Sequence, residues 1–171
     1  MTNDEALAGL QPQARNCALR LLMQFPILVL TSGLRNPDDQ ARAMAQNVFK
    51  AGIQWILNTY APSSVKAACV VALSALQHTG TDWDQAGIAA TLAGVFAKFS
   101  PHQLRELSVH LSGMAFDLEP IEDERAPQIL SAIREEIIAI IQAGGSAKFL
   151  DREGGLVRWH IEIPEPDPTQ P

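Results

Sequence analysis

The chain has 171 residues, a formal net charge of −6 and 47% hydrophobic residues. This length predicts one domain with a buried core, and the negative charge argues against a general electrostatic anchor for nucleic acid or an anionic cell wall. The sequence has no apolar run of membrane-spanning length, and its acidic start lacks the basic and apolar regions of a secretory signal. We therefore expect synthesis in the cytoplasm. Cys17 and Cys69 are expected to be reduced core thiols, and the alternative is a disulfide pair that no spacing motif requires.

The first part of the chain predicts a helix followed by a strand. Apolar residues recur at helical spacing from Leu7 to Leu22, with a nick expected at Pro12. Residues 27–30 are apolar and predict a short buried strand that leads into a turn. Arg35 is expected at the rim of this turn, so a guanidinium follows the first strand closely.

Residues 41–100 predict helices only. Asn36 and Pro37 have the residue types of an N-cap and a first helical residue, and Thr81 or Asp82 is expected to cap a later helix. The helical faces are rich in alanine, which favours a plain core. The alternative is an insertion that lines a cleft or docks a partner.

The C-terminal part predicts a strand, a helix and a hairpin. A strand ends at residues 118–120, and isoleucines along residues 129–141 give the following helix a buried stripe. Two strand-like runs, residues 148–153 and 156–163, flank a Gly154-Gly155 pair, which is a strong hairpin signal.

Alternation in the last strand separates a core face from a polar face. The core face is expected to carry Val157, Trp159, Ile161 and Ile163. The other face, which we interpret as the face of a cleft, is expected to carry Arg158, His160 and Glu162. Residues 164–171 are rich in proline and are expected to form a disordered tail.

Three residues have the chemistry of metal ligands. His110 and Asp117 lie seven positions apart, and His160 lies in the last predicted strand. Gly113 permits the bend that returns the chain toward the same ion. Two imidazoles and one carboxylate are a common ligand set for catalytic zinc, with a fourth position left for water. The alternative is a pair of buried strands with an incidental histidine.

These residues are part of a longer pattern, S-x-H-x-x-G-x-A-x-D. It is matched by Ser108, His110, Gly113, Ala115 and Asp117, a coincidence expected by chance in roughly one chain of this size in ten thousand. The pattern resembles the zinc D-alanyl-D-alanine carboxypeptidase and dipeptidase family, whose fold is shared with the hedgehog signalling domain. Residues 31–40 resemble the family's S-G-Y-R-S-x-x-x-Q segment, with Leu34 in place of tyrosine, and residues 159–162 resemble its closing W-H-x-E strand.

The resemblance implies an α+β fold in which a small antiparallel sheet carries a zinc site and packs with several helices. Residues 1–163 would form this single domain, with residues 41–107 as an extra helical segment. Zn²⁺ would be held by His110, Asp117 and His160.

The resemblance also implies roles for three residues outside the metal site. Arg35 would stabilise the oxyanion of the reaction, and the alternative is a surface ion pair with Asp38 or Asp39. Ser108 would help to bind the substrate. Gln40 would support the Arg35 loop or the substrate, unless it is merely exposed.

The general base departs from the family pattern. Many members carry an acid three residues before the last histidine ligand, where this chain has Val157. We expect Glu153 to act instead, with Asp151 as the second candidate unless it only forms an ion pair with Arg158. Glu162 shares the face of His160 and could orient that ligand.

The implied function is that of a zinc-dependent peptidase cutting D,D- or L,D-peptide bonds in the stem peptides of peptidoglycan. A phage endolysin released through a holin pore would reach this substrate, and a cytoplasmic enzyme would act on soluble D-Ala-D-Ala or recycled wall peptides. One alternative is an inactive zinc-bearing binding or structural module of the same fold. Another is a helical interaction protein without a metal.

Overall fold

The chain packs as two compact units in a computed structural model that describes residues 2–80 and 82–164. Unit 1 is built from the chain up to Leu34 and from Ser112 onward, and unit 2 from Arg35 to Leu111. The described residues contain eight α-helices and a four-stranded antiparallel sheet, so the predicted α+β class is confirmed. The single domain over residues 1–163 stays a prediction. The predicted disordered tail, apart from Pro164, lies outside the described residues.

Unit 1 combines three helices with the whole sheet. Its elements are α1 (Asn3–Ala8), α2 (Pro12–Gln24), β1 (Leu30–Ser32), β2 (Ala115–Leu118), α8 (Ala126–Gln142), β3 (Lys148–Glu153) and β4 (Leu156–Glu162). The nick predicted at Pro12 is a complete break between α1 and α2. Pro12 stands in the first turn of α2, where its missing N–H costs no hydrogen bond.

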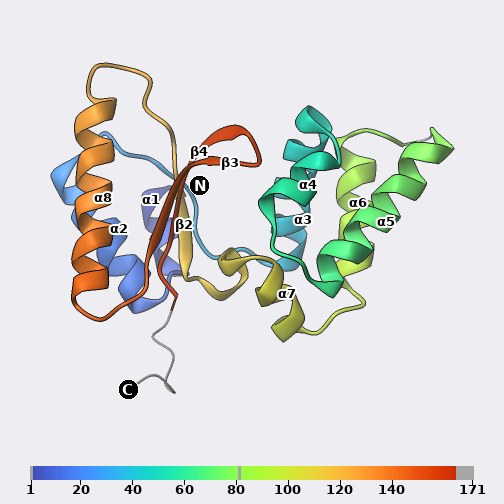
Figure 1. Ribbon diagram of the computed structural model, residues 1–171, viewed down its shortest axis with the longest axis horizontal. Helices are drawn as coiled ribbons and strands as arrows, with labels where there is room; N and C mark the ends of the chain where they lie inside the picture. The colour runs from blue at the N-terminus through green and yellow to red at the C-terminus, as the bar shows by residue number, and fades with distance from the viewer. Residues whose placement is uncertain (1, 81, 165–171) are drawn as a thin grey trace. The chain divides into compact units, whose positions relative to one another are not determined.

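The strands of unit 1 lie in the order β1-β2-β4-β3, and every neighbouring pair is antiparallel. The predicted β3–β4 hairpin is confirmed. It turns at Gly154 and Gly155, whose φ angles are 57° and 88°, as a tight hairpin turn requires. α2 packs against β2 and α8 against β3 (Figure 1).

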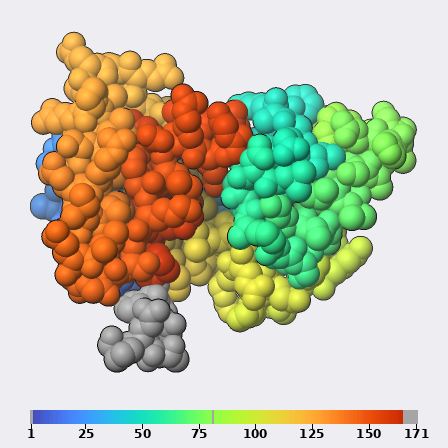
Figure 2. All heavy atoms as spheres, viewed as in Figure 1, coloured from blue at the N-terminus to red at the C-terminus, as the bar shows by residue number. Residues whose placement is uncertain are grey.

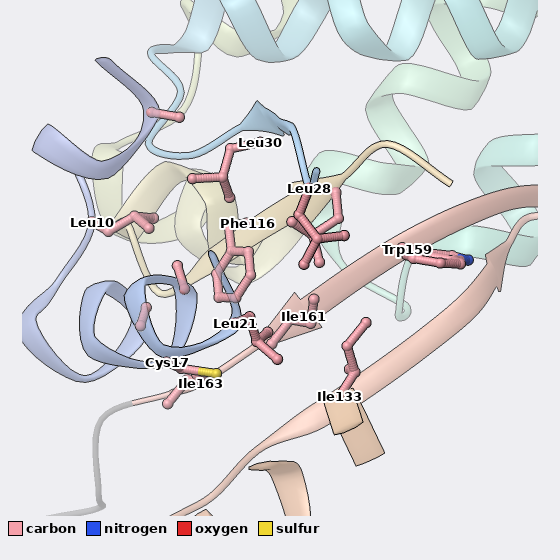
Figure 3. Close-up of a cluster of buried hydrophobic side chains, with 14 of the residues drawn as sticks. Leu10, Cys17, Leu21, Leu28, Leu30, Phe116, Ile133, Trp159, Ile161 and Ile163 are labelled. Carbon is pink, nitrogen blue, oxygen red and sulfur yellow. The ribbon is translucent and has the colours of Figure 1, made fainter. Parts of the chain in front are cut away.

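The core of unit 1 lies between these helices and one face of the sheet. Figure 3 shows Phe116 of β2 and Ile161 of β4 among leucines of α2 and β1. Fully or nearly fully buried members are Leu21, Leu28, Leu30, Phe116, Leu118, Ile129, Ile133, Trp159, Ile161 and Ile163. Because side chains alternate along a strand, the residues between them point to the opposite face of the sheet.

One residue of the predicted core face of β4 is not in the core. Val157 is 48% exposed, although the prediction for Trp159, Ile161 and Ile163 is confirmed. The register between β3 and β4 shifts at this point. Leu150 pairs with His160 and Arg152 with Val157, so two steps along β3 correspond to three steps back along β4. The additional residue on β4 breaks the alternation.

The predicted stripe on α8 is correct for most of its length. Ile129, Ile133 and Ile137 are buried and Ile140 packs against the core, but Ile141 is 51% exposed. At about 100° per residue, Ile141 lies roughly 120° around the helix from Ile129, whereas Ile140 lies only roughly 20° from it. The outer side of α8 and the hairpin form the orange and red surface in Figure 2.

The first strand begins later than predicted, at Leu30 rather than at residue 27. Leu28 and Leu30 are buried, but Ile27 and Val29 are 41% and 42% exposed. Asn3 of α1 holds this segment: its amide donates to the carbonyl of Leu28 (3.2 Å) and its side-chain oxygen accepts from the backbone N–H of Leu30 (2.8 Å). Only one face of the segment therefore meets the core.

Unit 2 is helical, as predicted for residues 41–100. It contains α3 (Pro37–Ala51), α4 (Gln54–Thr59), α5 (Ser64–Thr79), α6 (Gln85–Phe96) and α7 (Pro101–Leu107), and the 3-10 helix η1 (Val109–Ser112) begins within it. α6 packs against α3 and α5. Buried residues include Met44, Val48, Ile56, Leu73, Leu92 and Phe96. Unit 2 therefore has a core of its own.

The helix caps of unit 2 follow local side-chain chemistry. Asn36 caps α3 as predicted, accepting from the N–H of Asp39 at 2.8 Å. α6 is capped by Asp84, which accepts from the N–H of Gly87 at 2.8 Å, so the prediction of Asp82 is wrong and Thr81 lies outside the described residues. Asp82 adopts a left-handed φ of 58° and belongs to the preceding turn. No helix in residues 2–80 and 82–164 is long and apolar enough to span a membrane.

Candidate metal centre

The polar face of the sheet brings an aspartate and a histidine together. Asp117 of β2 is paired with His160 of β4, and directly paired residues project to the same face. The Nδ1 of His160 lies 2.7 Å from Oδ1 of Asp117. On the other side, the hydroxyl of Ser32 donates to Oδ2 of Asp117 at 2.8 Å. Strand pairing therefore creates one polar row from residues that are far apart in sequence.

His110 lies in η1 and is 4% exposed. The chain then turns at Gly113, where φ is +74°, and a Cβ at this position would lie 2.6 Å from the carbonyl oxygen of Gly9. The carbonyl of Gly113 accepts from the N–H of Gln11 at 2.9 Å. Only glycine fits a site that combines positive φ with this contact, so the bend predicted between His110 and Asp117 is present.

The three predicted ligands form a cluster. His110, Asp117 and His160 each offer one ligand atom, and these atoms lie within 4.8 Å of one another. Both histidines are buried, and Asp117 is partly buried. Two imidazole nitrogens and one carboxylate oxygen match a divalent transition metal better than a hard cation that prefers oxygen only. The group could therefore hold a metal ion, with at least one coordination position left open.

The imidazole of His160 contacts two carboxylates. Burial lowers its pKa, but hydrogen bonds to Asp117 and Glu162 and the charges of Asp117 and Glu153 outweigh burial and raise the pKa to about 10. Since carboxylates accept but do not donate, both ring nitrogens carry protons at neutral pH. A metal ion must displace one of these protons in order to bind.

The two candidate bases have different surroundings. Glu153 is the last residue of β3, and its charge is among those that raise the pKa of His160. Asp151 instead lies 3.4 Å from the guanidinium of Arg134 in α8. The choice of Glu153 before Asp151 as the general base stays a prediction.

Unit 2 contains a second polar group, centred on Gln40. Its side chain is buried, at 1% exposure, so the interpretation of Gln40 as merely exposed is wrong. Its Oε1 accepts from Nη1 of Arg35 and from the hydroxyl of Ser108, each at 3.3 Å. Its Nε2 donates to the hydroxyl of Tyr60 at 3.1 Å. The three residues predicted to serve the substrate thus share one hydrogen-bonded network.

Two members of these networks were not predicted from the sequence. Tyr60 follows α4 directly and lies two residues before Pro62, so the sequence marks it only as the end of a helix. The hydrogen bond from Ser32 to Asp117 depends on the pairing of β1 with β2. Asp39, a predicted partner of Arg35, forms an ion pair with Arg42.

Comparison with protein-family models, with curated proteins and with solved structures found no match in any of the three.

Proposed function

We propose that the chain is a zinc-dependent peptidase that hydrolyses D,D- or L,D-peptide bonds in the stem peptides of peptidoglycan. The observation that supports it is the convergence of His110, Asp117 and His160, whose ligand atoms lie within 4.8 Å of one another. The same three residues are the ones to which the resemblance to D-alanyl-D-alanine peptidases assigns zinc. The donor set fits Zn²⁺, which takes histidine nitrogen and carboxylate oxygen with one position open to solvent.

Each predicted residue has a role in this reaction. When bound, zinc would polarise the scissile carbonyl and lower the pKa of the attacking water. Glu153 would serve as the general base that takes a proton from the attacking water and passes it to the leaving amine. Arg35 supplies a permanent positive charge and a planar donor fork for the oxyanion.

The Gln40 network supports these roles. Because Gln40 is buried and bonds Arg35, it acts by orienting the guanidinium rather than by touching the substrate. The hydroxyl of Ser108 donates a hydrogen bond to Oε1 of Gln40, and its oxygen can still accept a hydrogen bond from a substrate N–H.

Digestion of purified peptidoglycan tests the proposal. Incubation of the zinc-loaded protein with peptidoglycan should release peptides with new amino and carboxyl ends. Mass spectrometry of these fragments identifies the bond, since D,D- and L,D-cleavage leave stem peptides of different mass. Absence of new ends, with zinc bound, would contradict a peptidase of peptidoglycan.

Glu153→Gln should lower the rate of this digestion by roughly a hundredfold or more, the usual scale for a lost general base. Zinc content and the thermal unfolding curve should stay unchanged, because the amide preserves the size of the side chain. Asp151→Asn is the matched control, and its rate should stay close to that of the parent protein. If Asp151→Asn is the inactive variant, Asp151 is the base.

Arg35→Lys should reduce turnover by about tenfold or more while zinc and fold are kept. Lysine retains the charge but not the planar fork, and complete loss of an oxyanion donor costs about 100- to 1,000-fold. Arg42→Lys is the control, since Arg42 pairs with Asp39 on the surface of α3. Equal turnover in Arg35→Lys and Arg42→Lys would show that the guanidinium of Arg35 takes no part in the reaction.

The second candidate is an inactive zinc-bearing module that binds peptidoglycan peptides. It is favoured by Val157, which is exposed and stands where related peptidases carry an acid. A zinc-loaded protein that binds stem peptides but cleaves none of them would support it.

For the active peptidase, the proposed setting is a phage endolysin, and the alternative is a cytoplasmic enzyme that acts on soluble D-Ala-D-Ala.

A further inference from the structure

The ring of His160 is held on both sides. Its Nδ1 lies 2.7 Å from Oδ1 of Asp117, and its Nε2 lies 3.0 Å from Oε1 of Glu162. The side chain is 4% exposed. A ring with an acceptor on each nitrogen has one well-defined orientation.

The two carboxylates differ in their relation to the metal cluster. Asp117 is itself a candidate ligand, so an ion shared by Asp117 and His160 takes the Nδ1 side of the ring. Glu162 lies two residues further along β4, on the Nε2 side. A neutral imidazole ligand keeps one N–H, and in this arrangement that N–H is the one that donates to Glu162.

Glu162 in turn forms a long ion pair with a lysine. It pairs with Lys148 of β3 across the hairpin, and the Nζ of Lys148 lies 3.9 Å from Oε1 of Glu162. Its partner on the other side is Ala115 of β2, which has no polar side-chain atom to compete for the carboxylate. The row Ala115–Glu162–Lys148 thus lies directly beside the row that contains Asp117 and His160.

Ser32 contacts Asp117 in the same way as Glu162 contacts His160, on the side of the ligand that faces away from the other ligand. Its hydroxyl donates to Oδ2 of Asp117, while Oδ1 faces His160. Each of the two ligands therefore has one atom held by a neighbour and one atom directed toward the cluster.

We propose that Glu162, fixed by Lys148, is a positioning residue that selects Nδ1 of His160 as the metal-binding nitrogen. This inference rests on the proposed metal centre, not on catalysis. A carboxylate that accepts the second N–H of a ligating histidine sets its tautomer and increases its basicity, and loss of such a partner weakens metal binding by roughly 10- to 100-fold.

Zinc affinity measures this role without reference to activity. The metal-free full-length protein competes with a chromophoric chelator for Zn²⁺ at fixed pH and ionic strength. Glu162→Ala should weaken apparent affinity by roughly 10- to 100-fold. Glu162→Gln should lose less, because the amide oxygen still accepts from Nε2, and Lys148→Met should have a smaller effect in the same direction.

Glu135→Gln is the matched control, because it removes an exposed carboxylate from α8 outside the cluster. Its zinc affinity should equal that of the parent protein. Circular dichroism of each metal-free variant shows whether it is folded. Unchanged affinity in folded Glu162→Ala would overturn the positioning role while leaving the metal centre intact.

The ligand nitrogen is identified by NMR of protein labelled with ¹⁵N-histidine. In the zinc-bound protein, His160 should show a protonated Nε2 and a metal-bound Nδ1, and the Glu162→Ala spectrum should lose this single state. A parent protein that binds no zinc would overturn both the inference and the proposed function. Zinc on Nε2, or unchanged zinc affinity in Glu162→Ala, would overturn the inference alone.

Discussion

We expect replacement of His160 or His110 by alanine to abolish stoichiometric zinc binding by the purified protein. With three ligands and one open position, the parent chain should contain about one zinc ion. Removal of one imidazole leaves two protein ligands, and we expect a loss greater than the roughly 10- to 100-fold seen when only an outer partner of a ligand is removed. Elemental analysis after dialysis against a weak chelator measures the zinc content of each variant.

His102→Ala is the control for this experiment. His102 is exposed in α7 and lies 3.4 Å from Glu106. Neither residue belongs to the ligand cluster found among residues 2–80 and 82–164. The zinc content of His102→Ala should equal that of the parent protein. Full zinc occupancy in both His110→Ala and His160→Ala would exclude these histidines as ligands, whatever the activity of the protein.

Gly113→Ala should lower the free energy of unfolding by about 2–5 kcal/mol. A left-handed backbone costs a residue with a Cβ roughly 1–2 kcal/mol, and overpacking costs about 1–3 kcal/mol more. The second contribution arises because the new methyl would lie 2.6 Å from the carbonyl oxygen of Gly9. Urea unfolding of the metal-free protein, followed by circular dichroism, gives the difference.

Gly155→Ala separates the two contributions. Gly155 also has a positive φ, 88°, but a Cβ there would have no atom within 4 Å. Its substitution should cost only the roughly 1–2 kcal/mol of backbone strain. Equal losses at Gly113 and Gly155 would show that the contact with Gly9 contributes nothing to the bend between His110 and Asp117.

The parts of the fold that depend on local chemistry could be predicted from the sequence. The break at Pro12, the cap at Asn36 and the hairpin at Gly154-Gly155 each depend on the backbone preferences of one or two residues. The cluster of His110, Asp117 and His160 could be predicted because a motif and a strand pattern specified its members. The ligand chemistry of the cluster follows directly from the residue types, two histidines and one aspartate.

Features that depend on pairing between distant segments could not be predicted. The shift between β3 and β4 exposes Val157, because the register of a strand is a property of its partner as well as of its own alternation. The contact of Glu162 with Lys148 depends on the same register. The Gln40–Tyr60 bond depends on how α3 and α4 pack, which no local pattern encodes.

The backbone hydrogen bond from the N–H of Arg35 to the carbonyl of His110 (3.0 Å) has a consequence for the order of folding. It joins the two ends of unit 2, which is one continuous segment with buried residues of its own. β1 and β2 are separated by roughly 80 residues, and folded unit 2 shortens that loop to fewer than about ten. Loop-closure entropy scales with the logarithm of length, so prior folding of unit 2 lowers the cost of pairing β1 with β2 by about 2 kcal/mol.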